Sequence, residues 1–418
     1  MLAILTTHPI QYQVPFWQAL AKDGRVPFEV WYLTDHGARP SLDREFGKTF
    51  AWDIETLTGY PHRVIDAAQG ATPPSFWKCR LRERLRDRLR QSAASALWVQ
   101  GWQVAAYWQG VREARAAGAE VWLRGESNDL AAARWWKRPI KRLALGRLFS
   151  QVDRFLYIGG ANKRLYQHFG VPETRLYATP YAVDNARFAR QAAAVRPHRA
   201  EWRRRWGIDD DAFCALFCGK FIAKKRPMDL VEAARLYGAD RRGSKIHLLF
   251  VGSGELDAAL REACDVVHDA ASSGAQCSAS RILPAAAAGR PRASFVGFLN
   301  QTEISRAYVA ADCLVLPSDE EETWGLVVNE ALASGTTAVA SRSCGCAEDM
   351  LPIGNGKRTF ESGNTQELAD VLHQVQCRPA LPAGVADVLS HHDLRMTASV
   401  VYSLYAQGAA NRRYCDRP

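Results

Sequence analysis

Short apolar runs alternate with polar, helix-like stretches along most of this chain. Two of these runs, Cys313–Leu316 and Thr337–Ala340, flank a segment with helical character at about Gly325–Ala333. An apolar strand, a helix and a second apolar strand together predict a βαβ unit of a parallel sheet. The loop that leaves the first strand, Pro317–Trp324, is therefore expected at the carboxyl edge of that sheet, where ligands of such folds bind.

The same alternation covers the first half of the chain and restarts after residue 211. Strands are predicted at residues 2–7, Phe28–Leu33, Ala96–Val99, Val121–Arg124 and Arg154–Ile158, and then at Cys214–Cys218, Ile246–Val251 and Ala293–Gly297. The helices predicted between them include Val14–Lys22, Lys78–Arg90, about 102–117, Asn162–Phe169 and Met228–Tyr237. Two series of alternating strands and helices indicate an α/β protein with two Rossmann-like domains.

The length of 418 residues favours two or three domains. Residues 189–211 are polar and rich in Arg and Ala, which indicates a linker, so the first domain is placed at 1–190 and the second at 191–390. The remaining segment, 391–418, contains a predicted helix that would pack back towards the first domain. Residues 266–292 are rich in Ala, Ser and Gly and are interpreted as a flexible surface insertion.

Composition narrows the class of protein. The hydrophobic fraction of 47% and the charged fraction of 23% are those of a globular protein. No stretch approaches the roughly 18 consecutive apolar residues of a membrane span. The amino terminus lacks the basic start of a signal peptide, so a soluble, cytoplasmic protein is expected. The cysteines form no CxxC pair and indicate reduced thiols; Cys344 and Cys346 are a candidate redox or metal pair, but no third ligand follows at metal spacing.

The formal net charge of +10 predicts attraction to an anionic partner: a nucleotide, a polyanionic acceptor, a membrane surface or a nucleic acid. Two segments, Lys78–Arg90 and Arg134–Phe149, concentrate cations, and the second mixes them with Trp135 and Trp136. Basic helices with aromatic residues are typical of contacts with anionic membranes. The alternative is a solvated charged face above an ordinary apolar stripe.

The loop after the strand Cys313–Leu316 and the helix that follows it carry paired carboxylates. Glu322 and Glu330 are separated by seven residues, so one lies in the loop and the other about one turn into the helix. Carboxylates accept hydrogen bonds from hydroxyl groups with charge assistance. The helix start at Gly325 offers unpaired N–H groups that suit a phosphate.

The string PSDEEETWGLVVNEALASG, residues 317–335, resembles the donor-sugar loop of retaining GT-B glycosyltransferases of family 4. The resemblance implies that Glu322 contacts hydroxyls of the donor sugar and that Glu330 holds the ribose of the nucleotide. The residues that would line the donor site with them are Trp324, Gly325 and Leu326. Members of that family usually carry Gly-Phe in place of Thr323-Trp324, which implies a tighter or differently shaped sugar pocket in this chain.

A second loop resembles the phosphate-binding loop of the same family. It follows the predicted strand Cys214–Cys218 and holds Gly219, Lys220 and Lys225. Gly219 allows the backbone to approach a phosphate closely, and the two lysines would neutralise the departing diphosphate. Lys220 stands where the family has arginine, so it would make a point contact instead of a fork. The resemblance therefore implies a catalytic set of Glu322, Lys225 and Lys220.

The amino-terminal string THPIQYQVPFWQAL resembles a subgroup of these enzymes that is associated with bacterial surface polysaccharides. His8, Gln11 and Tyr12 lie in its loop and would face the cleft between the domains, towards acceptor or donor. The alternative for His8 is a turn residue before a proline. Arg124 and Glu126 follow a predicted strand where many family members have a histidine. They either contact sugar or phosphate, or form a buried ion pair that fixes their loop.

Two further motifs are candidate metal or cofactor sites. Asp209–Asp211 has the DxD form of a metal site, but its place in the linker favours a solvated turn. Gly252 and Gly254 belong either to a dinucleotide fingerprint or to a structural turn, and no third glycine follows. No metal and no cofactor are predicted, because Lys220 and Lys225 can neutralise the diphosphate.

The sequence thus predicts a GT-B fold, with two Rossmann-like domains facing a central cleft, and a glycosyltransferase of the hexosyltransferase type. Its substrates would be a nucleoside diphosphate sugar, UDP-linked by family analogy, and a glycan, lipid-linked or small-molecule acceptor. The basic segments predict a peripheral contact with the inner face of the cell membrane. No nucleic acid partner is expected. One alternative is a non-catalytic basic protein that binds an anionic polymer or nucleic acid; another is an epimerase or phosphorylase on the same fold.

Overall fold

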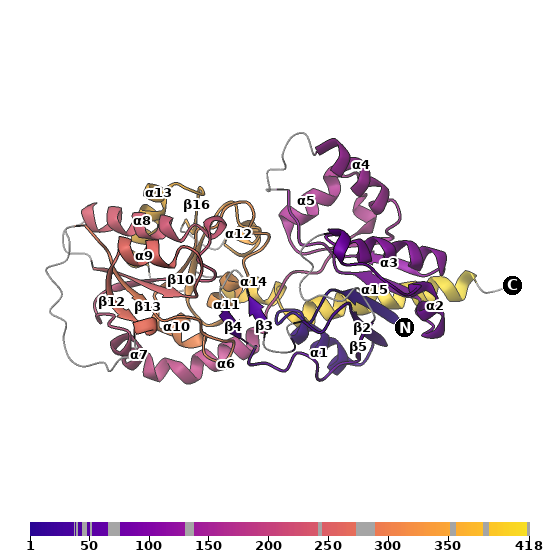
Figure 1. Ribbon diagram of the computed structural model, residues 1–418, viewed down its shortest axis with the longest axis horizontal. Helices are drawn as coiled ribbons and strands as arrows, with labels where there is room; N and C mark the ends of the chain where they lie inside the picture. Colours follow the sequence, from indigo (N-terminus) through magenta and orange to yellow (C-terminus); the bar gives the residue numbers. More distant parts are fainter. Residues whose placement is uncertain are drawn as a thin grey trace. The chain divides into compact units, whose positions relative to one another are not determined.

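The structure of the protein is a computed structural model, whose described residues are 1–36, 38, 41–43, 48–50, 52–65, 76–129, 138–240, 245–272, 289–351, 357–378 and 384–415. The chain divides into two compact units (Figure 1). The first comprises Met1–Ser41, Ile54–Asp184 and His391–Pro418, and the second comprises Leu42–Asp53 and Asn185–Ser390. Each unit is built on a parallel sheet with helices packed against it, which confirms the predicted α/β class with two Rossmann-like domains.

The described strands of the first unit follow the order β5-β2-β1-β6-β7-β8-β9 and pair in parallel. They are β1 (Leu2–Thr6), β2 (Phe28–Tyr32), β5 (His62–Val64), β6 (Ala96–Val99), β7 (Glu120–Leu123), β8 (Arg154–Tyr157) and β9 (Leu176–Ala178). Every residue of β1 and β6 is buried, as expected for central strands of a sheet covered on both faces. The strand order reverses between these two strands, so the loop after β1 leaves at the crevice where such sheets bind ligands.

Two sets of helices cover the first sheet. One core joins the sheet to α2 (Leu85–Gln91), α3 (Ala105–Ala116), α4 (Arg138–Phe149) and α5 (Gly160–His168). The other core joins it to α1 (Val14–Asp23) and to α15 (Leu394–Cys415), the yellow helix of Figure 1. Leu394, Ala398, Val401 and Leu404 are spaced three or four apart and bury one face of α15 in this core. The carboxyl-terminal helix is therefore a structural part of the first unit.

The described strands of the second unit follow the order β12-β13-β11-β10-β14-β15-β16, again in parallel. They are β10 (Phe213–Cys218), β11 (Ile246–Val251), β12 (Asp265–Asp269), β13 (Arg292–Phe295), β14 (Cys313–Leu316), β15 (Thr337–Ser341) and β16 (Thr359–Phe360). The βαβ unit predicted around residues 313–340 is confirmed: β14 and β15 pair side by side, and α11 (Leu326–Ala333) connects them.

The helices of the second unit also form two groups. In one group α8 (Pro227–Asp240), α9 (Asp257–Ala263) and α13 (Thr365–Cys377) share a core with the sheet. In the other, α10 (Ser305–Ala310) packs against α6 (Asn185–Val195) and α7 (Arg199–Arg205), and α6 packs against α11. The described residues also form the short helices α12 (Ala347–Met350) and α14 (Val385–His391), the paired strands β3 (Ser41–Asp43) and β4 (Lys48–Phe50), and several 3-10 helices of three residues each.

The prediction of a polar linker at 189–211 is wrong. Those residues form most of α6 and all of α7. Phe188 and Ala192, one helical turn apart, bury a face of α6. Arg203 of α7 is buried and donates hydrogen bonds to the carbonyl oxygens of Asp209, at 2.7 Å, and of Ala310, at 3.0 Å. A stretch rich in Arg and Ala therefore forms two packed helices. The composition does not reveal this, because the buried Arg203 donates its hydrogen bonds to backbone carbonyl groups and not to solvent.

Two other boundaries differ from the predictions. The proposed insertion 266–292 begins with strand β12, which lies at the edge of the sheet beside β13; its residues 273–288 lie outside the described part of the chain. The helix predicted over Lys78–Arg90 begins only at Leu85, because Arg84 has an extended backbone. In the stretch before it, Cys79 and Leu81 are buried, and the Leu81 N–H bonds to the side chain of Gln109 at 2.8 Å instead of continuing a helix.

Candidate functional site

The candidate site of the second unit lies where three strands end at one edge of the sheet. The loops after β10, β14 and β15 leave from neighbouring strands, and backbone hydrogen bonds join them. The Asp319 N–H donates to the Lys224 carbonyl at 3.0 Å, and the Cys346 N–H donates to the Trp324 carbonyl at 3.0 Å. The Gly345 N–H donates to the carbonyl of Glu322 at 3.1 Å. These bonds hold the lysine-bearing and glutamate-bearing loops together.

Lys225 and Glu322 form a direct ion pair between two of these loops. Their side chains are 22% and 12% exposed, and Ser318 donates a hydrogen bond to the same Glu322 oxygen at 3.3 Å. Burial by itself would lower the pKa of Lys225, but the Glu322 carboxylate outweighs it and the pKa lies above its usual value. Lys225 is therefore charged at neutral pH and lies against the loop that carries Glu322.

Glu330 lies on α11 and is almost fully buried, with 2% of its surface exposed. Its Oε2 accepts a hydrogen bond from the Tyr308 hydroxyl at 2.6 Å, while its Oε1 has no hydrogen-bond partner among the described residues. Burial raises the pKa of Glu330 to about 7, against the opposing effects of Tyr308 and of the Arg187 charge. An unpaired carboxylate oxygen inside a protein is costly, and a ligand hydroxyl would satisfy it.

Cys218, the last residue of β10, lies within electrostatic range of both Lys225 and Glu330. Its thiol pKa is raised to about 12, mainly by burial; the Glu330 charge raises it further and the Lys225 charge lowers it. Both charges therefore lie within electrostatic range of one thiol at the end of β10. The structure thus brings Lys225, Glu322 and Glu330 to one edge of the sheet, next to Gly219 and the half-buried Lys220.

Glycines allow these loops to pack closely. Gly252 has a left-handed backbone, and a Cβ at this position would lie 1.9 Å from the Gly219 carbonyl oxygen. A Cβ on Gly254 would lie 2.6 Å from the carbonyl oxygen of Phe221. Of the two interpretations left open for Gly252 and Gly254, the structure supports the structural turn: both glycines make room for the backbone of the 219–221 loop.

Gly325 has the same kind of role at the start of α11. Its backbone is left-handed, with φ of 106°, and a Cβ would lie 2.5 Å from Leu316 Cδ2 and 3.2 Å from Cys346 Sγ. The neighbouring Trp324 side chain is buried, and Leu326 is half-buried at the first helical position. The departure from the family pattern at Thr323-Trp324 therefore inserts a large side chain into the body of the unit.

Some contributors to this site gave no signal in the sequence. Tyr308 lies on α10, and nothing in the linear pattern links it to Glu330. Ser318 stood inside the predicted loop, but its contact with Glu322 depends on the fold of that loop. Ser341, at the end of β15, donates to the carbonyl of Ser318 and fixes the start of the glutamate loop.

In the first unit, the predicted residues of the amino-terminal loop lie after β1. The Thr7 hydroxyl and His8 Nδ1 are 3.0 Å apart, and the rings of His8 and His36 are 5.4 Å apart. Burial, followed by the nearby His36, lowers the pKa of His8 to about 4, so His8 is neutral at physiological pH. Gln11 and Tyr12 are half-buried in the turn that precedes α1.

Arg124 and Glu126 are connected through Tyr181 of the same unit. The buried Arg124 lies over the Tyr181 ring, 4.9 Å from its centroid, and donates to the Thr179 carbonyl at 3.3 Å. The Tyr181 hydroxyl donates to Glu126 Oε1 at 2.9 Å. The tyrosine thus stands between the two charges, and Arg124 fixes the segment that carries it.

Two carboxylates of the candidate metal motif form ion pairs. Asp209 pairs with Arg292 at 2.5 Å, and Asp211 pairs with Lys245 at 2.8 Å. Within the described ranges no group of three or more His, Cys, Asp or Glu side chains is arranged to hold a metal ion. Burial raises the thiol pKa of Cys344 to about 12 and that of Cys346 well above its usual range.

None of the helices in the described part of the chain has the length and apolarity needed to cross a membrane.

Known proteins share parts of this sequence and this fold. The family described as Glycosyl transferases group 1 matches residues 198–376. The D-inositol 3-phosphate glycosyltransferase of Geodermatophilus obscurus is 34% identical over 182 residues, which are 43% of this chain and 35% of that protein. The chain therefore spans about a third of the length of this curated relative.

Solved structures resemble the whole described architecture. Sucrose-phosphate synthase from Thermosynechococcus elongatus has a TM-score of 0.65 at 17% identity, covering 98% of this chain and 99% of that one. Anabaena Alr3699/HepE, solved in complex with UDP and glucose, has a TM-score of 0.64 at 13% identity, covering 97% and 99%. At such identities the likeness concerns the fold. This chain carries a glycosyl transferases group 1 domain at residues 198–376, and its fold is GT-B.

Proposed function

We propose that this protein is a retaining glycosyltransferase of the family 4 type, which transfers a sugar from a nucleoside diphosphate donor to an acceptor. The observation that carries the proposal is the pairing of Lys225 with Glu322 beside a buried Glu330 that has an unpaired oxygen. A phosphate-neutralising cation and two hydroxyl-accepting carboxylates at one sheet edge are the groups that a nucleotide sugar requires. A surface that binds only an anionic polymer has no use for buried carboxylates beside its cations.

Each residue has a proposed task. The unpaired Oε1 of Glu330 accepts a ribose hydroxyl, and Tyr308 holds the other oxygen. Glu322 accepts hydroxyls of the donor sugar, while the N–H groups at the start of α11, from Gly325 onward, face the phosphates. Gly219 provides close backbone approach, and Lys220 and Lys225 carry positive charge to the diphosphate.

The reaction is proposed to be driven by leaving-group stabilisation. Departure of the diphosphate leaves an oxocarbenium-like sugar, and catalysis rests on positioning and electrostatics. One ion pair at 4 Å is worth about 1 kcal/mol in water but about 4 kcal/mol at the effective dielectric of a half-buried site. The half-buried setting of Lys225 is therefore part of the proposed mechanism. We propose that the lysines take this role without a metal ion or cofactor, which a titration with EDTA tests.

The UDP form of the donor is supported by Anabaena Alr3699/HepE, a protein of this fold solved with UDP and glucose. The acceptor is proposed to be a glycan, a lipid-linked sugar or a small molecule, on the resemblance of the amino-terminal string to enzymes of surface polysaccharides. His8, Gln11 and Tyr12 are the proposed contacts to it, together with the Arg124, Tyr181 and Glu126 group.

Calorimetric titration of UDP, GDP and ADP into the full chain tests the donor site, with release of the nucleotide from the matching UDP-sugars as the activity readout. We expect one diphosphate to bind, Lys225→Ala to abolish turnover, and Glu322→Gln to abolish turnover while the nucleotide still binds. The control is Lys357→Ala, which removes another lysine paired with a glutamate in the same unit. Full turnover in either site variant, or equal loss in the control, would refute the assignment.

The proposed membrane contact uses the helices on one face of the first sheet. Trp77 and Leu143 are 67% and 78% exposed, and exposed cations flank both, including Lys78, Arg80, Lys141 and Arg142. The Arg80 guanidinium lies 5.2 Å from the Trp77 ring centroid. Residues 134–137 of the second predicted basic segment lie outside the described residues. Exposed apolar side chains with cations next to them in the sequence suit an anionic lipid surface.

Co-sedimentation with phosphatidylglycerol vesicles, against phosphatidylcholine vesicles, tests this contact. We expect binding to the anionic vesicles only, weakened by added salt and by Leu143→Ser. Met396→Ser is the control, since Met396 is also exposed but lies on α15, which covers the other face of the sheet. Equal binding of the Leu143 variant and the wild type would contradict this surface.

A further inference from the structure

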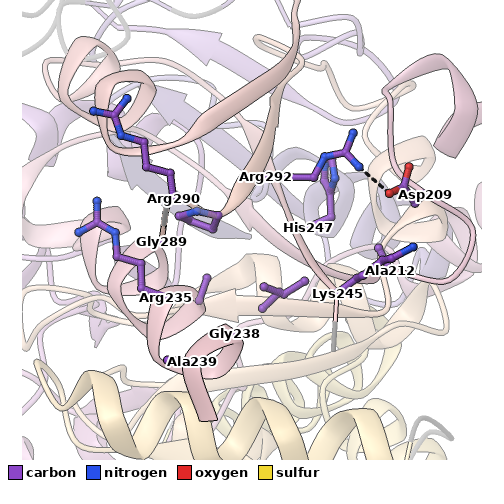
Figure 2. Close-up of a pocket in the computed structure, with 13 residues that line it drawn as sticks. Asp209, Ala212, Arg235, Gly238, Ala239, Lys245, His247, Gly289, Arg290 and Arg292 are labelled. Carbon is purple, nitrogen blue, oxygen red and sulfur yellow. Dashed lines mark hydrogen bonds and ion pairs between the residues drawn. The ribbon is translucent and has the colours of Figure 1, made fainter. Parts of the chain in front are cut away.

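The second unit contains a cavity of about 430 Å³ (Figure 2). None of the described residues of the candidate donor site lines it. Its lining includes Ala212, Ile246 and Arg292, which stand at or directly before the first residues of β10, β11 and β13. The donor loops leave from the opposite, carboxyl ends of the sheet. Six residues of β10, at about 3.3 Å each, separate the two edges by roughly 20 Å. A ligand in this cavity therefore does not share atoms with the nucleotide.

Four cationic side chains line the cavity, in two groups. Figure 2 shows Arg235 and Arg290 on one side, and Arg292 beside Asp209 on the other. Arg235 and Arg290 both act electrostatically on the thiol of Cys264, so both lie near that residue. Arg292 likewise acts on Lys245, which follows from their positions at the starts of neighbouring strands. The cavity thus has a pair of cations at each side.

The carboxylate partners of these cations hold them weakly. Arg235 pairs with Glu232 at 3.1 Å, and Lys245 pairs with Asp211 at 2.8 Å. These pairs and the Arg292–Asp209 pair are exposed on both sides, and exposed ion pairs are readily exchanged for a better partner. Arg290 makes no hydrogen bond or ion pair with another described residue. The cations are therefore available to a multiply charged anion.

Much of the remaining lining is uncharged. It includes small or apolar residues, namely Ala212, Ala234, Ala239, Ile246 and Pro291. His247 also lines the cavity; it is buried, and its Nε2 lies 2.9 Å from the Ser294 hydroxyl. Burial, and then the charges of Arg292 and Arg203, lower the pKa of His247 to about 3, so it stays neutral. The volume falls in the range of small-molecule sites.

We propose that this cavity binds a small metabolite with two phosphate groups, one at the Arg235 and Arg290 pair and one at the Lys245 and Arg292 pair. The carbon skeleton between the phosphates contacts the uncharged part of the lining. Arginine suits phosphate oxygens because its fork can donate two hydrogen bonds to them. The site is independent of the nucleotide site, so both ligands bind at the same time.

Calorimetric titration of fructose 1,6-bisphosphate into the full chain tests the proposal, with glucose as the neutral comparison. We expect the bisphosphate to bind and glucose not to bind. Arg235→Ser combined with Arg290→Ser should weaken the affinity by roughly tenfold or more, because charged hydrogen bonds are lost. Arg290→Ser alone should also weaken it, and this exposed residue has no described partner whose loss would disturb folding. Lys225→Ala should leave the affinity unchanged.

The control is Arg204→Ser, which removes another exposed arginine of the same unit from outside the cavity. Three results would overturn the proposal. The first is wild-type affinity in the double variant, the second is loss of binding in Lys225→Ala, and the third is equal weakening in Arg204→Ser. Since these titrations contain no nucleotide, their failure leaves the proposed glycosyltransferase activity untouched.

Discussion

The hydroxyl of Tyr308 donates a hydrogen bond to Oε2 of Glu330 at 2.6 Å, on a carboxyl group whose other oxygen has no partner among the described residues. One oxygen of this buried carboxyl group is thus held by a hydrogen bond, and the other can still accept one. A group held in this way can accept a hydroxyl without reorganising. The same burial makes its ionisation expensive, so the state of Glu330 connects stability, pH and ligand binding in this protein.

The first prediction concerns stability. Burial raises the folded-state pKa of Glu330 from its usual 4.5 to about 7. Between these values the folded protein keeps a proton that the unfolded chain has lost, so stability falls as the pH rises through this window. We expect Glu330→Gln to gain up to about 3 kcal/mol of unfolding free energy relative to the wild type between pH 5 and pH 8. Urea denaturation at both pH values measures this, and an unchanged difference would contradict it.

The second prediction concerns the pH dependence of nucleotide binding. The carboxylate of Glu330, and not its protonated form, is the proposed acceptor of ribose hydroxyls, so affinity for the nucleotide should rise with pH through about 7. Tyr308→Phe removes a hydrogen bond that lowers this pKa, and should therefore move the midpoint to higher pH. Calorimetric titrations across a pH series check both statements. An identical midpoint in the variant would argue against coupling between Tyr308 and Glu330.

The third prediction separates stability from activity at the Lys225–Glu322 pair. Removing only the lysine, as in Lys225→Met, leaves a mostly buried carboxylate whose other hydrogen-bond donor among the described residues is Ser318, and should cost about 1–3 kcal/mol. Adding Glu322→Gln should restore much of that stability, because the uncompensated charge is gone. Turnover should stay absent in the double variant. Denaturant midpoints and product assays on the four proteins of this cycle provide the test; a double variant less stable than Lys225→Met would contradict the explanation.

The fourth prediction concerns Gly252, which packs against the loop that begins at Gly219. Gly252→Ala forces a Cβ to within 1.9 Å of the Gly219 carbonyl, on a left-handed backbone, and should destabilise the unit by about 1–3 kcal/mol. Displacement of the 219–221 loop should also weaken nucleotide binding. Gly146→Ala is the matched control, because this helical glycine of α4 has open space around it and should gain about 0.5–1 kcal/mol. Thermal unfolding of both variants measures the contrast, and a neutral Gly252→Ala would rule out the close packing.

The sequence by itself determined the α/β architecture, because strands buried on both faces must be short and apolar, and helices must alternate with them. It also determined which loops follow which strands: Gly219 to Lys225 after β10, and Ser318 to Glu322 after β14. Local composition gave a wrong prediction where a charged side chain is buried and bonded to the backbone. The composition of residues 189–211 indicates a linker, whereas in the structure Arg203 donates hydrogen bonds to the carbonyl oxygens of Asp209 and Ala310.

The tertiary structure decided which of these residues meet. Neither the spacing of Glu322 and Glu330 nor the lysine loop indicates that Lys225 pairs with Glu322, because their contact depends on β10 lying beside β14 in the sheet. Tyr308 reaches Glu330 only through the packing of α10. The cations at the opposite sheet edge are scattered from Arg235 to Arg292 in the chain, and parallel strands gather them because all their amino ends share one edge. Pattern fixes the elements, whereas contacts between distant side chains follow from the order in which those elements pack.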